Sequence, residues 1–151
     1  MNIEILACGR MKKGAHADLF QDYLKRMDWN VHVHEIESRY KEQKKIHSDE
    51  CVQILARIKP DCFVIALDER GKTMPSREIA AKFEMLQNES HAQVQCILGG
   101  ADGLNDTIRA RADFLLSFGR QTWPHMLARV MLLEQIYRSQ QILKKHPYHR
   151  D

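Results

Sequence analysis

The sequence predicts an α/β fold in which a mostly parallel sheet is flanked by helices. Strand-like and helix-like segments alternate along the chain, and two of the strand-like segments, 62–67 and 94–98, are continuous apolar runs. Such runs are typical of parallel strands covered on both faces, and the alternation is typical of an α/β sheet. A chain of 151 residues can bury one core, so we expect a single domain over residues 1–151.

The amino-terminal elements follow from the spacing of apolar residues. Residues 3–7 are an apolar strand, and a helix is expected over about 15–27. Three of its residues lie at helical spacing and are expected to pack: Leu19, Tyr23 and Arg26. Apolar and polar residues alternate over 31–36, which indicates an edge strand.

The charged stretch 39–47 is expected to be loose. Ser48 then provides a helix cap, and the helix is expected to run to about Ile58 and to stop before Pro60.

After the first apolar run, Pro75 and Ser76 open a helix. Its apolar residues fall at i, i+4 and i+7, namely Ile79, Phe83 and Leu86. The strand 94–98 follows, then a short helix near 104–112 and a strand over 114–117.

A long helix over about 124–143 bears on assembly, because its apolar residues cover far more than one face. They are Met126, Leu127, Val130, Met131, Leu132, Leu133, Ile136 and Tyr137. A helix that is apolar on several sides is buried on several sides, so we expect a homodimer with a partner subunit against it. The alternative is a central helix within one monomer.

Composition narrows the class of protein. No apolar run reaches the length of a membrane span, and the amino terminus lacks the order of a secretory signal. The four cysteines stand singly, which favours reduced thiols in a cytoplasmic protein. The eight histidines show no metal-binding spacing, so no metal site is expected.

Charge is unevenly distributed along the chain. Residues 1–108 hold 15 Lys and Arg against 17 Asp and Glu, whereas residues 109–151 hold 8 against 3. The basic final third indicates a polyanionic partner such as nucleic acid, with a solvated basic helix as the alternative.

Ligands of open α/β sheets bind beyond the carboxyl ends of the strands, which here are expected to lead into loops over 68–73, 99–103 and 118–123. The first lacks the glycine that a P-loop needs five residues before Gly71, and we reject that motif. The second lacks the first glycine of a dinucleotide fingerprint. Its paired glycines permit either close approach of a ligand or a tight turn.

Two further segments of the sequence contain side chains that can accept or donate protons. His125 lies in the first turn of the long helix, whose positive end disfavours imidazolium, so it is a candidate general base or, alternatively, a cap or surface residue. The terminal residues 146–151 combine two imidazoles, a phenol and a guanidinium, which suggests a tail that reaches into a site.

Taken together, the motifs resemble the RlmH family of ribosomal large-subunit methyltransferases, in the SPOUT superfamily. They are Leu67-Asp68-x-x-Gly71-Lys72, Gly99-Gly100-x-x-Gly103-Leu104, Ser117-Phe118, Thr122-x-Pro124-His125, Arg129-Val130, Glu134-Gln135-x-Tyr137-Arg138 and the terminal HPYHR. The resemblance covers essentially the whole chain.

The resemblance implies more than the spacing does. Members use S-adenosylmethionine to methylate N3 of a pseudouridine (the family target is pseudouridine 1915) in 23S rRNA of the assembled 70S ribosome. They act as homodimers, and a deep trefoil knot forms in the carboxyl-terminal part of the chain near the cofactor.

The resemblance also implies the site residues. For the cofactor they are Leu67, Gly99, Phe118, Gly119, Arg120, Gln121, Thr122 and Trp123. Gly119 and Gln121 depart from the family pattern, in which a serine and a methionine or leucine are usual.

Our mechanistic hypothesis is that His125 accepts the N3 proton, while Arg150 stabilises charge on the base oxygens and Tyr148 orients the base, with one subunit's tail crossing to its partner. The residues expected to contact the RNA are Arg129, Arg138, Lys144, Lys145 and His149. Two alternatives remain: a ribosome-binding factor without catalysis, and a generic α/β nucleotide-binding protein.

Overall fold

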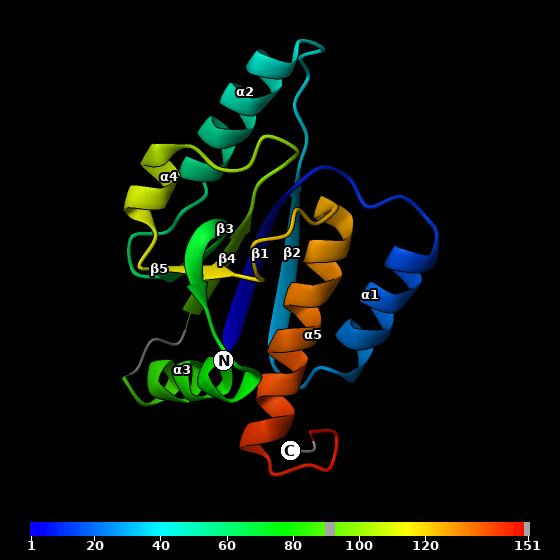
Figure 1. Ribbon diagram of the computed structural model, residues 1–151, viewed down its shortest axis with the longest axis vertical. Helices are drawn as coiled ribbons and strands as arrows, with labels where there is room; N and C mark the ends of the chain where they lie inside the picture. Colours follow the sequence, from blue (N-terminus) through cyan, green and yellow to red (C-terminus); the bar gives the residue numbers. More distant parts are fainter. Residues whose placement is uncertain (90–92, 150–151) are drawn as a thin grey trace.

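The computed structural model describes residues 1–89 and 93–149, which form a five-stranded sheet flanked by helices (Figure 1). The strands are β1 (Asn2–Cys8), β2 (Asn30–Ile36), β3 (Phe63–Thr73), β4 (Gln93–Leu98) and β5 (Phe114–Ser117). The helices are α1 (Ala15–Arg26), α2 (Gln43–Leu55), α3 (Ser76–Asn88), α4 (Asp106–Arg111) and α5 (His125–Leu143).

The strand order is β2-β1-β4-β3-β5, and every pair of neighbours is parallel. The predicted α/β class with a parallel sheet is confirmed, and β2 is an edge strand as expected. Because all strands run in one direction, their carboxyl ends meet at one edge of the sheet, where ligands of such folds bind.

The helices cover the sheet on both faces. Helices α1, α3 and α5 share one core cluster with residues such as Ile5 of β1, while α2 and α4 share a second cluster with Leu6. Successive side chains of a strand point to opposite faces, so adjacent residues belong to different cores. Helix α5 starts at the carboxyl edge of the sheet and runs down to the end where the carboxyl terminus lies (Figure 1).

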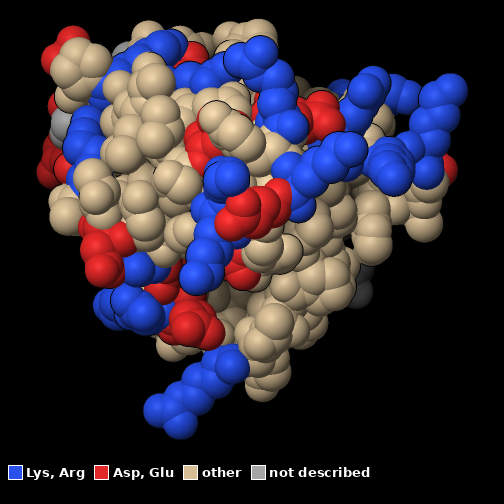
Figure 2. All heavy atoms as spheres, turned by 90° about the horizontal axis from the view of Figure 1, so that it is seen from above, with Lys and Arg blue, Asp and Glu red and all other residues tan. Residues whose placement is uncertain are grey.

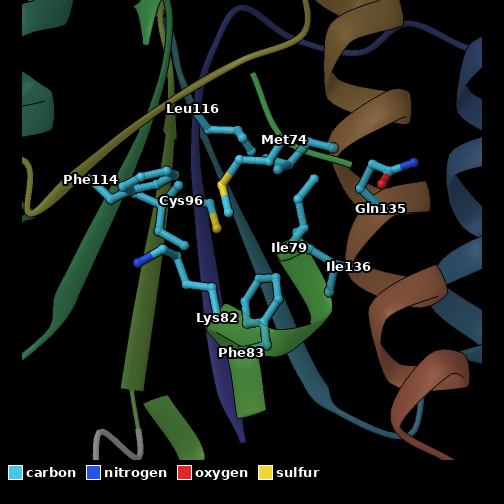
Figure 3. Close-up of a pocket in the computed structure, with 11 residues that line it drawn as sticks. Met74, Ile79, Lys82, Phe83, Cys96, Phe114, Leu116, Gln135 and Ile136 are labelled. Carbon is cyan, nitrogen blue, oxygen red and sulfur yellow. The ribbon is translucent and has the colours of Figure 1, made fainter. Parts of the chain in front are cut away.

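The core between α3, α5 and the sheet is closely packed. Figure 3 shows the side chains around its residual cavity, which holds only about 10 Å³, roughly the space of one water molecule. The Lys82 ammonium lies 4.5 Å from the centre of the Phe114 ring at the rim of this cavity. Burial raises the pKa of the nearby Cys96 thiol to about 12. No organic ligand fits here, so this cavity is a packing void.

Three sequence predictions on the elements need correction. Helix α2 begins at Gln43, so the stretch 39–47 is partly helical and Ser48 lies inside the helix. Its first turns are polar and exposed, and no apolar face marks their start. On α1, Leu19 is 45% exposed and Phe20 is the buried residue. The positions Ile79, Phe83 and Leu86 of α3 are all buried, as predicted.

Strand β3 extends beyond its apolar run, which corrects the expectation of a loop over 68–73. Leu67 and Lys72 both pair with Leu116 of β5, so the residues between them form a bulge. A β-carbon at Gly71 would lie 2.7 Å from the backbone of Leu115. Gly71 therefore permits close approach of two strands rather than phosphate binding.

None of the helices in the described part of the chain is long and apolar enough to cross a membrane.

Candidate active site at the carboxyl ends of the strands

A cavity of about 720 Å³ opens at the carboxyl edge of the sheet. It is lined by the ends of β3, β4 and β5, by the segments that follow them, and by the start of α5. Its size lies within the usual range of small-molecule sites. The three strand ends that the sequence predicts to be functional therefore meet at one site.

The glycine turn after β4 forms one wall. A β-carbon at Gly99 would lie 2.5 Å from the carbonyl oxygen of Gly103, and the Gly103 N–H donates to the Gly100 carbonyl at 3.1 Å. Gly103 has a φ of 70°, which glycine adopts without strain. Of the two interpretations, the tight turn is required by this geometry, and the same turn lines the cavity.

Behind this turn lies a partly buried carboxyl group. A β-carbon at Gly100 would lie 2.8 Å from Oε2 of Glu50. Burial raises the pKa of Glu50, although the hydrogen bond from the Cys8 thiol opposes that effect. Burial and the neighbouring Glu50 raise the pKa of Cys8 to about 12, so the thiol keeps its proton at neutral pH.

The segment after β5 forms the opposite wall. The Ser117 hydroxyl accepts a hydrogen bond from the Gly119 N–H at 3.2 Å, and Trp123 Nε1 donates to the Phe118 carbonyl at 3.3 Å. Gly119 has a φ of 110°, in the region that favours glycine. These contacts fold residues 117–123 into a short arc, and the indole ring of Trp123 lines the cavity.

An ion pair that the sequence analysis missed closes the side of the cavity. Arg109 Nη1 lies 3.1 Å from Oδ2 of Asp68, and the same nitrogen donates to the Leu104 carbonyl. The pair ties the bulge of β3 to the segment after β4. Spacing could not reveal it, because its partners are 41 residues apart.

His125 lies where the cavity meets the loop after β1. Its imidazole is exposed and lines the cavity. A β-carbon at Gly9 would lie 3.4 Å from His125 Nε2, so the loop passes directly beside the ring. The imidazole is therefore accessible from the cavity.

The structure brings together most of the residues that the resemblance assigns to the cofactor. Those that line the cavity are Leu67, Gly99, Phe118, Gly119, Gln121, Thr122 and Trp123. Arg120 is exposed and does not line it, so its side chain points elsewhere. Gln121 is one of the two departures from the family pattern, and its Oε1 would lie 2.7 Å from a β-carbon at Gly119.

Within one chain, the tail lies away from this cavity. The Tyr148 hydroxyl donates to Glu134 Oε1 at 3.1 Å and lies 3.3 Å from the Tyr23 hydroxyl. Burial and that hydrogen bond to Tyr23 raise the pKa of Tyr148. The phenol is thus held on α5 of its own chain, and Arg150 lies outside the described residues.

The expectation that Arg129 contacts RNA phosphates is wrong. Its side chain is buried, only 1% of the residue is exposed, and its guanidinium faces the chain itself. It donates to the Cys8 and Gly9 carbonyls at 2.9 and 2.7 Å and pairs with Glu35 at 2.8 Å. Burial lowers the pKa of Arg129, and the Glu35 carboxylate offsets this only in part. Arg129 fixes the loop after β1 to α5.

The other residues expected to bind RNA differ in whether their charges are already paired within the chain. Arg138 pairs with Glu134, its Nη1 lies 3.4 Å from Nδ1 of His149, and its guanidinium lies 4.8 Å from the centre of the Tyr148 ring. Lys144 pairs with Asp28 and is half exposed. Lys145 is exposed at a φ of 55°. Most of the basic charge of this region is therefore balanced locally. Among residues 1–89 and 93–149, no cluster of His, Cys, Asp and Glu could hold a metal ion.

The fold is that of an open parallel α/β sheet, and its cavity lies beyond the ends of the strands, where ligands of such folds bind. Two solved structures share the fold at low sequence identity. A probable methylase family protein from Haemophilus influenzae has a TM-score of 0.57 at 10% identity over 99% of this chain and 70% of that one. A putative methyltransferase from Legionella pneumophila, in complex with SAM, has a TM-score of 0.50 at 15% identity over 93% of this chain and 66% of that one.

Comparisons of sequence give the family. A family model described as "Predicted SPOUT methyltransferase" matches residues 1–149. The chain is 43% identical to ribosomal RNA large subunit methyltransferase H of Rhodospirillum centenum, over 99% of both chains. It is 38% identical to the protein of the same name from Zymomonas mobilis, over 100% of this chain and 99% of that one. The chain belongs to the SPOUT methyltransferase family that includes these ribosomal RNA large subunit methyltransferases H.

Proposed function

We propose that this protein transfers a methyl group from S-adenosylmethionine to N3 of a pseudouridine in 23S rRNA of the assembled ribosome. The observation that carries the proposal is the cavity at the three strand ends, in a chain whose full-length relatives are named ribosomal RNA large subunit methyltransferase H. A single methyltransferase domain over residues 1–151, located in the cytoplasm with its ribosomal substrate, is part of the proposal.

The residues present fit this cofactor. The cavity volume of about 720 Å³ suits a nucleoside with an amino-acid arm. Leu67 and Trp123 offer apolar walls for an adenine ring, and the turn at Gly99 brings backbone groups close without an intervening side chain. When bound, S-adenosylmethionine supplies an electrophilic methyl carbon on a sulfonium. The protein then has to align the acceptor and manage one proton.

We assign the proton to His125. N3 of pseudouridine carries a hydrogen and is a poor nucleophile until that proton leaves, so a base must lie beside it. The exposed His125 ring at the edge of the cavity can accept the proton directly or through water. Tyr148 is assigned to orienting the base and Arg150 to stabilising charge on the flanking oxygens.

This assignment requires two subunits. Tyr148 packs against Tyr137 and bonds to Glu134 on its own α5, which lie 12 and 9 residues after His125, or about 14 to 18 Å along the helix axis. In a two-fold pair of antiparallel α5 helices, the end of one helix lies near the start of the other. The tail of one subunit would then reach the cavity of its partner.

The homodimer is supported by an apolar groove along α5. This groove has a volume of about 510 Å³ and lies between α1, the end of β3 and the segment after β5. Its apolar lining includes Leu19, Met74, Phe118, Leu127 and Met131. The groove shares Phe118 and Gly119 with the cofactor cavity, so a subunit seated there would border the site. The family resemblance leads us to include the deep trefoil knot in the proposal.

The test uses purified protein, S-adenosylmethionine and 70S ribosomes from cells that lack this modification. Mass spectrometry of the large-subunit RNA should find one added methyl group on a pseudouridine, at N3. Calorimetry with the cofactor runs in parallel, because a ribosome-binding factor without catalysis need not bind it. Absence of a methyl group from the RNA together with absence of cofactor binding would refute the proposal.

A further inference from the structure

We infer that the β1–α1 loop is the surface that binds rRNA phosphates next to the nucleotide to be methylated. This inference rests on the proposed function and names a contact surface for it. The loop carries three cations, Arg10, Lys12 and Lys13, which together are called the basic loop below.

The charges of the basic loop are free. All three side chains are exposed, and within residues 1–89 and 93–149 none has an ion-pair or hydrogen-bond partner. Several basic residues of the final third differ, because Arg109 and Arg129 are held in ion pairs, although Arg120 and Lys145 are exposed. The excess of basic residues in the final third therefore does not by itself locate the unpaired positive charge.

The position of the basic loop links it to the site. A second cavity of about 430 Å³ is lined by residues 10–16 together with His125 and Met126. His125 also lines the cofactor cavity, so its ring lies at the junction of the two spaces. A nucleotide whose base reaches His125 would have its backbone beside the basic loop.

The loop is held in this position by hydrogen bonds to Arg129 and Glu35. Arg129, one turn after His125 on α5, donates to the Gly9 carbonyl at 2.7 Å. Glu35 accepts from both Arg129 at 2.8 Å and the Met11 backbone N–H at 2.7 Å. The start of the loop is thus fixed relative to His125, which limits the entropy lost when the cations engage a ligand.

The segment after β2, which starts beside the basic loop, carries further exposed cations. Strands β1 and β2 are paired up to Cys8 and Ile36, and the Gly9 N–H donates to the Ile36 carbonyl at 2.8 Å, so the chain leaves both strands side by side. The segment after β2 adds three exposed cations without partners in the described chain: Arg39, Lys41 and Lys44. Viewed onto this end of the molecule, Lys and Arg gather on the side where α1 lies (Figure 2).

The ligand that fits is an RNA backbone. Several mobile point charges along a groove bind phosphates and confer affinity without reading sequence, and such binding weakens steeply with salt. Lys side chains suit this role because the ammonium binds as a point charge rather than as a fixed fork.

The test compares the double variant Lys12→Gln/Lys13→Gln with a charge-matched control, Arg57→Gln/Lys59→Gln, whose exposed cations lie after α2, before β3. Ribosome affinity is measured by sedimentation at several salt concentrations, without cofactor. The loop variant should bind about tenfold more weakly, and the slope of log affinity against log salt should fall by about 2, since each phosphate contact contributes about 1. The control should change neither value.

Further measurements separate the outcomes. Cofactor affinity and kcat at saturating ribosomes should stay at the wild-type values, while the KM for ribosomes rises. Lys12→Arg/Lys13→Arg should restore the affinity. Unchanged ribosome affinity and salt slope in the Gln variant would overturn the inference. A Gln variant that binds phosphatidylglycerol vesicles more weakly than the wild type, but binds ribosomes equally well, would overturn it too. If the wild type binds ribosomes through the loop but methylates no RNA, the proposed function fails and the inferred surface stands.

Discussion

The guanidinium of Arg129 donates a hydrogen bond to the carbonyl oxygen of Gly9 at 2.7 Å, across 120 residues of sequence. This contact joins the helix that carries His125 to the loop that leaves β1. A basic residue that composition assigns to RNA is instead a structural element of the site.

Replacement of Arg129 by alanine should destabilise the fold. The Cys8 and Gly9 carbonyls would lose their charged donor and Glu35 its ion-pair partner. We expect a loss of about 3 kcal/mol in the free energy of unfolding, as for the removal of one member of a buried pair. Urea unfolding monitored by circular dichroism measures it.

The control is Arg57→Ala, which removes an exposed guanidinium bonded only to the Gln53 carbonyl of the preceding helix α2 and should cost less than about 0.5 kcal/mol. Equal losses for the two variants would contradict the structural role of the Arg129 contacts.

Substitution Gly99→Ala should distort the turn that lines the cofactor cavity. The added methyl would meet the Gly103 backbone at 2.5 Å, and backbone on both sides leaves no flexible side chain to yield. S-adenosylmethionine should bind at least about tenfold more weakly by calorimetry, which corresponds to 1.4 kcal/mol. Ala101→Ser, an exposed position in the same turn, should keep the wild-type affinity.

His125→Ala should slow methyl transfer without weakening cofactor binding. Loss of a positioned general base costs about 100-fold or more in kcat. Single-turnover methylation of ribosomes measures the chemical step, and calorimetry measures the cofactor affinity. A variant that transfers methyl groups at the wild-type rate would remove His125 from the mechanism and leave it a surface residue.

Stability should fall at alkaline pH because of the buried Cys96. Burial raises its pKa from 9.0 to about 12, so the unfolded chain loses this thiol proton at lower pH than the folded chain does. The contribution is fully present below pH 9 and is lost as the pH rises toward 12. Between pH 8 and pH 10 the free energy of unfolding should fall by about 1.4 kcal/mol from this thiol.

Unfolding in urea at the two pH values gives this loss, and it should be smaller by that amount in Cys96→Ala. Val94→Ala truncates an equally buried side chain of the same strand that cannot ionise, so it should keep the wild-type dependence on pH. An identical dependence in both variants would contradict the assignment to the thiol.

The sequence was a good guide wherever a local pattern reports burial. The spacing of Ile79, Phe83 and Leu86 predicted a buried helix face, and all three are buried. The location of the site was also predictable, because parallel strands bring their carboxyl ends to one edge whatever the loops contain.

The wrong predictions for segment 68–73 and for Arg129 share one cause. Asp68 and Gly71 have the composition of a turn, and only pairing with β5 makes them part of a bulged strand. The sequence around Arg129 does not show whether its guanidinium is in solvent or bonds to the carbonyls at the end of β1. The contacts that decide both cases join residues distant in the chain, and periodicity does not report such contacts.

The central claim is that the cavity of one subunit is completed by the tail of the other. It is tested by mixing two inactive variants, His125→Ala and a chain that ends at residue 145. Neither homodimer should methylate ribosomes, although the shortened chain should still bind the cofactor. A mixed dimer has one intact cavity facing one intact tail.

The measurement is methyl transfer to ribosomes after the two variants are unfolded and refolded together in equal amounts. Random pairing makes half of the dimers mixed, with one working site of two, so activity should recover to about a quarter of the wild-type value. A mixture that stays inactive, while size-exclusion chromatography shows that mixed dimers have formed, would contradict the claim.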